Sequence, residues 1–138
     1  MFESYSDATK QAIIEARRAC EGHSGKSIRG RHLLVGLLSV DDDDLITLLA
    51  QRSLDPTRLR KKVSSSLRRQ KGHSPLELPF LGDSVTALRN SHQLFLIGRT
   101  RVVRPIHLLL SLATIEHGPV SRILRECGIE VQDIERLA

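Results

Sequence analysis

Two histidines occupy matching positions in the chain and are the first candidates for chemistry. His32 and His107 each lie near a predicted helix start and are each followed by Leu-Leu. A pair of imidazoles suggests metal binding or acid–base catalysis, but neither has a carboxylate or cysteine at ligand spacing, and zinc sites ordinarily need three or four protein ligands. We therefore expect these histidines to pack and hydrogen-bond locally, with no metal site and no catalytic role.

Other segments resemble catalytic motifs only in part. Gly25-Lys26-Ser27 ends like a phosphate-binding P-loop, but the required earlier glycine falls at Cys20, and the preceding segment is helical. The serines at 64–66 lie in a helical, basic stretch and form no GxSxG elbow. Cys20 and Cys127 have neither CxxC nor recognisable Cys/His spacing. These departures predict a protein that is not an enzyme and binds no cofactor.

Two clusters of basic residues stand just before predicted helix starts. They comprise Lys26, Arg29 and Arg31 in the first half of the chain and Arg99, Arg101 and Arg104 in the second half. Free N–H groups and the helix dipole favour anions at a helix start. Our hypothesis is that these clusters recognise acidic segments of a partner protein. The alternative, that they are solvated loop charges, stays open at this point.

The composition predicts an α-helical, cytoplasmic protein. Aromatic residues make up 3% of the 138 residues, whereas Leu, Ile, Val and Ala recur at three- and four-residue spacing. The N-terminal residues show no signal peptide, and no apolar run is long enough to span a bilayer, so no membrane contact is expected. The net charge of +5 permits attraction to acidic partners.

The chain repeats itself at an offset of 75 residues, which lays 5–63 over 80–138 without a gap. The clearest match sets Arg29 to Leu37 over Arg104 to Leu112, and apolar positions coincide almost throughout. The repeat predicts one all-α domain, 1–138, built from two tandem four-helix copies related by a pseudo-twofold axis. The first copy is 1–70, a Gly/Pro/Ser-containing linker is 71–79, and the second copy is 80–138.

Caps and breaks mark four helices in each copy. Ser6 or Asp7 caps the first helix, Asp55-Pro56 starts the fourth, and Gly118-Pro119 separates two helices of the second copy. The predicted helices cover 7–22, 30–40, 41–52 and 55–70 in the first copy, and 83–97, 105–116, 119–126 and 131–137 in the second.

Several of these segments resemble the double repeat found at the N-terminus of Clp-type AAA+ unfoldases, with the ClpC branch the most similar. The matching residues are Phe2, Tyr5-Ser6-Asp7-Ala8, His32-Leu33-Leu34-Val35-Gly36-Leu37, Leu78-Pro79-Phe80 and His107-Leu108-Leu109-Leu110-Ser111-Leu112. The resemblance covers the whole chain, which lacks ATPase modules. It implies a non-catalytic domain that docks protein substrates or adaptors for a Clp ATPase in protein quality control.

One departure from the ClpC pattern changes the expected ligand. In that branch each repeat carries Thr-Glu-His at this helix start, and the glutamate is associated with binding phosphorylated arginine. Here the triplets are Gly30-Arg31-His32 and Pro105-Ile106-His107. We therefore do not expect phosphoarginine binding. The predicted partner-binding surface is the groove between the copies, flanked by the two basic clusters and by Phe2, Tyr5, Phe80 and Leu81.

Two alternative functions remain at this stage. The predicted fourth helix and its tail are basic, with Arg58, Arg60, Lys61, Lys62, Arg68, Arg69 and Lys71. They favour weak electrostatic binding of nucleic acid, although no aromatic platform or recognition helix accompanies them, so nucleic acid is the less favoured partner. A structural relative that has lost peptide binding is the other alternative.

Overall fold

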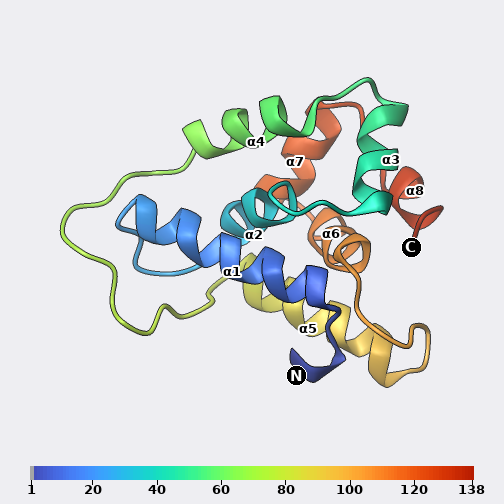
Figure 1. The fold of residues 1–138 in the computed structure, drawn as a ribbon, viewed down its shortest axis with the longest axis horizontal. Helices are drawn as coiled ribbons and strands as arrows, with labels where there is room; N and C mark the ends of the chain where they lie inside the picture. The colour runs from blue at the N-terminus through green and yellow to red at the C-terminus, as the bar shows by residue number, and fades with distance from the viewer. Residues whose placement is uncertain (1) are drawn as a thin grey trace.

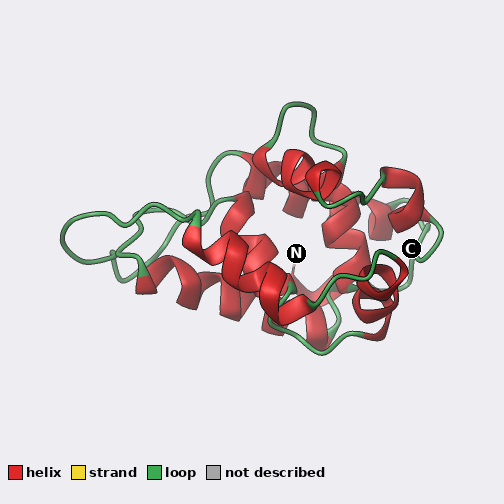
Figure 2. Ribbon diagram, turned by 90° about the horizontal axis from the view of Figure 1, so that it is seen from above, coloured by secondary structure: helices red, strands yellow, loops and turns green. Residues whose placement is uncertain are grey.

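The computed structural model describes residues 2–138 and is helical, with loops between the helices (Figures 1 and 2). A short 3-10 helix, η1 (Phe2–Ser4), precedes the α-helices. The first copy contains α1 (Asp7–Gly22), α2 (Gly30–Leu37), α3 (Asp43–Gln51) and α4 (Pro56–Ser65); the second contains α5 (Asp83–Leu96), α6 (Pro105–Ala113), α7 (Pro119–Glu126) and α8 (Val131–Glu135). The all-α fold class and the order of the helices are as the sequence predicts.

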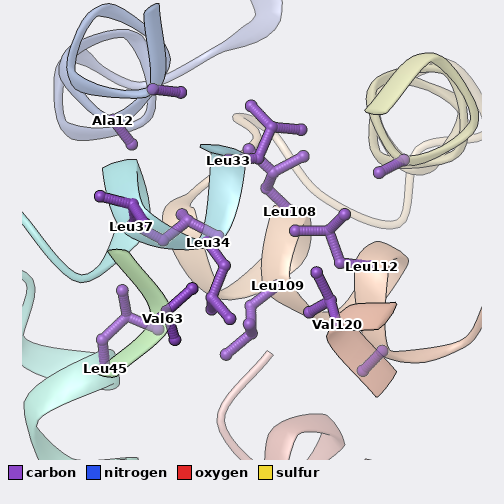
Figure 3. Close-up of a cluster of buried hydrophobic side chains, with 14 of the residues drawn as sticks. Ala12, Leu33, Leu34, Leu37, Leu45, Val63, Leu108, Leu109, Leu112 and Val120 are labelled. Atoms are coloured by element: carbon purple, nitrogen blue, oxygen red, sulfur yellow. The ribbon is translucent and has the colours of Figure 1, made fainter. Parts of the chain in front are cut away.

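The core forms around α2 and α6, the most apolar helices of the two copies. Figure 3 shows Leu33 and Leu34 of α2 close to Leu108 and Leu109 of α6. Leu37 of α2 lies nearer Ala12, Leu112 of α6 lies nearer Val120, and each of these leucine side chains is buried. In Figure 1, α1 and α5 lie on one side of this central pair, and α3, α4, α7 and α8 lie on the other. Burial of apolar surface between these layers stabilises the fold.

Hydrogen bonds at equivalent positions hold the two copies together. Val103 N–H donates to the Ser4 carbonyl and Ile28 N–H to the Pro79 carbonyl, both at 2.7 Å. The hydroxyl of Thr9 donates to the Val103 carbonyl at 2.7 Å, and the hydroxyl of Ser84 donates to the Ile28 carbonyl at 2.6 Å. Within each pair of bonds, the two donor residues are 75 residues apart, and so are the two acceptor residues. The loop before α2 therefore pairs with the start of copy two, and the loop before α6 pairs with the start of copy one. The two copies are therefore related by a pseudo-twofold axis.

The fourth helix is shorter than predicted from the sequence. It ends at Ser65 instead of continuing to about residue 70. The hydroxyls of Ser65 and Ser66 donate to the carbonyls of Lys62 and Val63. Such side-chain hydrogen bonds compete with the backbone hydrogen bonds that would continue the helix. Beyond this point Gln70 N–H donates to the His23 carbonyl at 2.9 Å. The tail of copy one therefore turns toward the loop after α1.

Two other helices also end earlier than predicted: α2 at Leu37 and α6 at Ala113, each about three residues short. Next to the first of these ends, the Ser39 hydroxyl donates to the Val35 carbonyl. The linker 71–79 forms no helix and lies against the C-terminal end of α1 and the loop that follows it. There, Ser74 donates to the Gly25 carbonyl at 2.6 Å, and Arg17 donates to the Leu76 carbonyl at 2.5 Å.

Candidate protein-binding site

The two histidines cap their helices. The backbone N–H of Arg29 donates to His32 Nδ1 at 2.9 Å, and that of Arg104 donates to His107 Nδ1 at 3.0 Å. An Nδ1 that accepts a hydrogen bond carries no proton, so both rings are neutral. Burial lowers the pKa of both histidines, and nearby positive charge, including Arg29 and Arg104 respectively, lowers it further. This geometry agrees with the local role expected from the sequence.

A hollow of about 510 Å³ opens beside the start of α2, and both copies line it. We call it the basic hollow. Its lining residues are Ser27, Arg29, Arg31, His32, Leu67, Arg68, Gln70, Asp83 and Pro119. The predicted cluster residues Arg29 and Arg31 thus lie in one site, and the structure adds Arg68, which the sequence had placed on a basic fourth helix.

Charge in the basic hollow is unbalanced and partly unsatisfied. Three guanidinium groups face one carboxylate, that of Asp83. Asp83 Oδ1 accepts the N–H of Gly30 at 2.7 Å, so this carboxylate already occupies the N-terminus of α2. Within the described residues, Asp83 Oδ2 and Arg31 Nε are buried and have no hydrogen-bond partner. Buried polar atoms of this kind are rare in folded proteins.

The equivalent position in copy two differs in charge and burial. Arg104, the counterpart of Arg29, forms an ion pair with Asp44 at 2.5 Å, whereas Arg29 faces Pro119, the counterpart of Asp44. Arg31 is replaced by Ile106, which is fully buried, and Asp83 by Ala8. The two basic clusters of the sequence therefore differ in structure: the first lines the basic hollow, whereas Arg104 of the second is neutralised by Asp44. Asp44 lies in the first turn of α3, within the acidic run 41–44.

The other predicted partner-binding residues lie in different surroundings. Phe2 is exposed, and its ring centroid lies 5.5 Å from that of Tyr5 and 6.4 Å from that of Phe80. Tyr5 is buried, with its hydroxyl donating to the Leu88 carbonyl at 3.0 Å, so it belongs to the core. Leu81, just before the start of α5, is exposed.

The remaining basic candidates are exposed. Lys26 donates to the His73 carbonyl at 2.5 Å, which ties it to the linker. Arg99 and Arg101 lie in the loop between α5 and α6 and form no ion pair among the described residues. In the part of the chain that the structure describes, no group of three His, Cys, Asp or Glu side chains is arranged to hold a metal ion.

This arrangement is the fold of the N-terminal domains of Clp-type ATPases. The chain superposes on the N-terminal domain of the chaperone ClpD from Arabidopsis thaliana with a TM-score of 0.76 and 19% identity, covering 99% of this chain and 96% of that one. For the Hsp104 N-terminal domain from Candida albicans the TM-score is 0.79 at 17% identity, over 97% and 88%. A ClpV N-domain in complex with a VipB peptide gives 0.75 at 18% identity, over 98% and 84%.

At the level of sequence, the chain is 27% identical over 117 residues to uncharacterized proteins of Mycobacterium tuberculosis and Mycobacterium bovis. The match covers 85% of this chain and 46% of those proteins, so the chain spans about half the length of the curated relatives it matches. No protein-family model matches the chain. Among the described helices, none is both long enough and apolar enough to cross a membrane.

Proposed function

We propose that this chain is a non-catalytic protein-binding module that docks substrates or adaptors in Clp-type quality control. The observation that carries the proposal is the basic hollow, which both copies line and in which the three arginines Arg29, Arg31 and Arg68 outnumber the single carboxylate of Asp83. The fold supports it, because a ClpV N-domain of the same fold has been solved with a VipB peptide. A Clp ATPase is the partner to which such a module would deliver its cargo.

The charges of the basic hollow define the ligand. Its three arginines favour a ligand with acceptor oxygens, and the carboxylate of Asp83 favours one that also carries hydrogen-bond donors. An acidic peptide segment offers carboxylates as acceptors and its backbone N–H groups as donors. A nucleic-acid phosphate backbone offers acceptors only, and its charge is repelled by Asp83. The basic hollow therefore favours an acidic peptide over nucleic acid.

Fluorescence polarisation tests this proposal with a labelled 12-residue peptide rich in Glu and Ser. We expect the wild-type protein to bind it and Arg31→Glu to weaken binding by roughly tenfold or more, because a charge-assisted hydrogen bond is lost and a like charge is introduced. The matched control is Arg122→Glu, which makes the same change of charge at an exposed position on α7. It should weaken binding by less than about twofold.

Three results would contradict the proposal. Equal losses for Arg31→Glu and Arg122→Glu would mean that net charge alone attracts the peptide. No binding by the wild-type protein would support a structural relative without a peptide site. Tighter binding of a random-sequence DNA oligonucleotide at physiological salt would favour the basic stretch 58–71 as a nucleic-acid surface.

A further inference from the structure

The last turn of α5 exposes three consecutive large apolar side chains. Phe95, Leu96 and Ile97 are 38%, 60% and 55% exposed, and Figure 1 shows this end of α5 and the loop after it at the edge of the molecule. We call Phe95, Leu96, Ile97, Arg99 and Arg101 the α5 tip. It shares no residue with the basic hollow. Contiguous exposed apolar side chains of this kind mark interaction surfaces more often than isolated ones do.

The duplicated fold shows that apolar residues are not required at this position. In copy one, the counterparts of Leu96 and Ile97 are Glu21 and Gly22, at the end of α1. Glu21 is solvated and paired with Arg17 at 3.0 Å, and a Cβ added at Gly22 would meet no atom within 4 Å. The same helix end, in the same fold, is therefore built without large apolar side chains at these two positions. Folding does not explain Leu96 and Ile97.

Phe95, unlike Leu96 and Ile97, is partly explained by packing within the fold. Its counterpart in copy one is the buried Cys20, and its own ring packs on His92 with the centroids 5.9 Å apart. Phe95 therefore continues the internal face of α5 while leaving part of its ring exposed. Leu96 and Ile97 carry the inference, and Phe95 extends the apolar surface next to them.

The charge next to this surface defines what fits on it. From residue 84 to residue 115 the chain contains no Asp or Glu. Arg104 in this stretch is neutralised by Asp44, but Arg99 and Arg101 are exposed and form no ion pair within the described residues. An apolar surface beside two free guanidinium groups is complementary to apolar side chains flanked by carboxylates.

We infer that the α5 tip is a docking surface for an amphipathic acidic segment of a partner protein. Leu96 and Ile97 contact the apolar face of that segment, and Arg99 and Arg101 pair with the Asp or Glu residues beside it. Recognition of an amphipathic helix by an apolar surface follows this general pattern of anchors at helical spacing. This second surface is independent of the proposed peptide site in the basic hollow.

The probe for the test is a labelled 14-residue amphipathic peptide with Leu on one face and Glu beside it, measured by fluorescence polarisation on the full chain. The tip variant is Leu96→Gln with Ile97→Gly, which approaches the residues of copy one and so keeps the fold. We expect it to weaken binding roughly tenfold, since two apolar anchors are lost. The variant Arg99→Gln with Arg101→Gln should weaken binding roughly threefold or more and reduce its dependence on salt.

Two controls make the result specific. Ile14→Gln removes a side chain that is 45% exposed on α1, comparable to the tip residues, and should change the affinity by less than about twofold. Arg31→Glu in the basic hollow serves as the second control and should leave tip binding within about threefold. A peptide with Lys in place of Glu should bind at least about tenfold more weakly than the acidic peptide.

The inference is overturned if the tip variant binds as tightly as the wild type, if Ile14→Gln weakens binding equally, or if the Lys peptide binds as well as the Glu peptide. Sedimentation velocity of the wild-type chain tests whether a second copy occupies the tip, because Ile46 is exposed next to the acidic residues at the start of α3. We expect a monomer at concentrations up to about 100 μM. Self-association that is abolished in the tip variant would overturn the assignment to a partner protein.

Discussion

At the scale of single residues, the duplicated histidines show how one side chain can substitute for another in a helix cap. In an ordinary capping box the third helical residue is Glu or Gln, whose side chain accepts the N–H of the cap residue. Here His32 and His107 accept that N–H through Nδ1. The sequence predicted a local role for both histidines. The acceptor atom and the neutral tautomer that follows from it are seen only in the structure.

This cap makes the stability of the fold depend on pH. Burial lowers the pKa of His32 and His107 in the folded state. The unfolded state, with a histidine pKa of about 6.5, therefore binds more protons below that pH. The free energy of unfolding should be largest above about pH 6.5 and should fall as the pH falls through the interval down to the lowered values. Protonation also removes the acceptor at the start of α2 and of α6.

The variant His32→Gln with His107→Gln tests this origin of the pH dependence, because Gln keeps an acceptor and does not titrate. We expect urea unfolding of the variant to change less between pH 7.5 and pH 5.5 than that of the wild type. The difference should be at most about 1.4 kcal/mol per histidine per pH unit. His117→Gln, at an exposed position after α6, is the control. An equally steep pH dependence in the double variant would contradict the explanation.

At the scale of helices, the contact of α1 with α2 depends on one glycine. A Cβ at Gly36 would lie 2.0 Å from the Ala12 carbonyl oxygen and 2.8 Å from the Ala16 nitrogen. The backbones of α1 and α2 therefore approach more closely than any side chain allows. The counterpart in copy two is Ser111, which is buried and donates to the His107 carbonyl at 3.0 Å. The two copies thus share a helix order but differ in the residue at this position of the second helix.

Gly36→Ala should destabilise the protein, because the two helices must separate to accept the methyl group. Overpacking of this kind typically costs about 1–3 kcal/mol, which exceeds the gain in helix propensity of about 1 kcal/mol. Thermal and urea unfolding measure the change. The matched control is Gly22→Ala, where the added Cβ meets no atom within 4 Å. A loss of stability in the control as large as that in Gly36→Ala would rule out the steric explanation.

At the scale of the whole molecule, the two copies depend on each other. The carbonyls of Ile28 and Val103 each accept bonds from the start of the opposite copy. The leucines of α2 and α6 cover one another in the centre (Figure 3). An isolated copy would leave both the hydrogen-bonding groups and the apolar face of its second helix in water. Half the chain also has too few residues to bury a large core.

We therefore expect residues 1–70 alone to lack a cooperative unfolding transition in urea, and residues 80–138 to behave in the same way. Far-UV circular dichroism of each fragment should show less helix than the corresponding part of the full chain. The full chain should unfold in one transition, as small single domains usually do. A sigmoidal transition in either fragment, or two transitions in the full chain, would show that the copies are separate folding units.

The sequence predicted the eight α-helices, because apolar spacing and caps are local signals. The repeat offset of 75 residues predicted how these helices group into two copies. Helix ends were less predictable, as the early end of α4 shows, since the serine hydroxyls compete there with helical bonds. The sequence indicated Arg29 and Arg31 as a basic cluster. It did not predict the basic hollow, because Arg68, Asp83 and Pro119 reach it from three other segments. Nor did it predict that Asp44 neutralises Arg104.

The reciprocal bonds between the copies also set the order in which the chain can complete its fold during synthesis. Thr9 and Val103 are separated by 94 residues, and Ser84 and Ile28 by 56. Pairings so distant in sequence form slowly, because the intervening chain must close a long loop. The first copy emerges from the ribosome before its partner exists, so its apolar helices stay uncovered until the last third of the chain has been made. A protein whose proposed role is to receive other chains would thus itself pass through an interval of exposure.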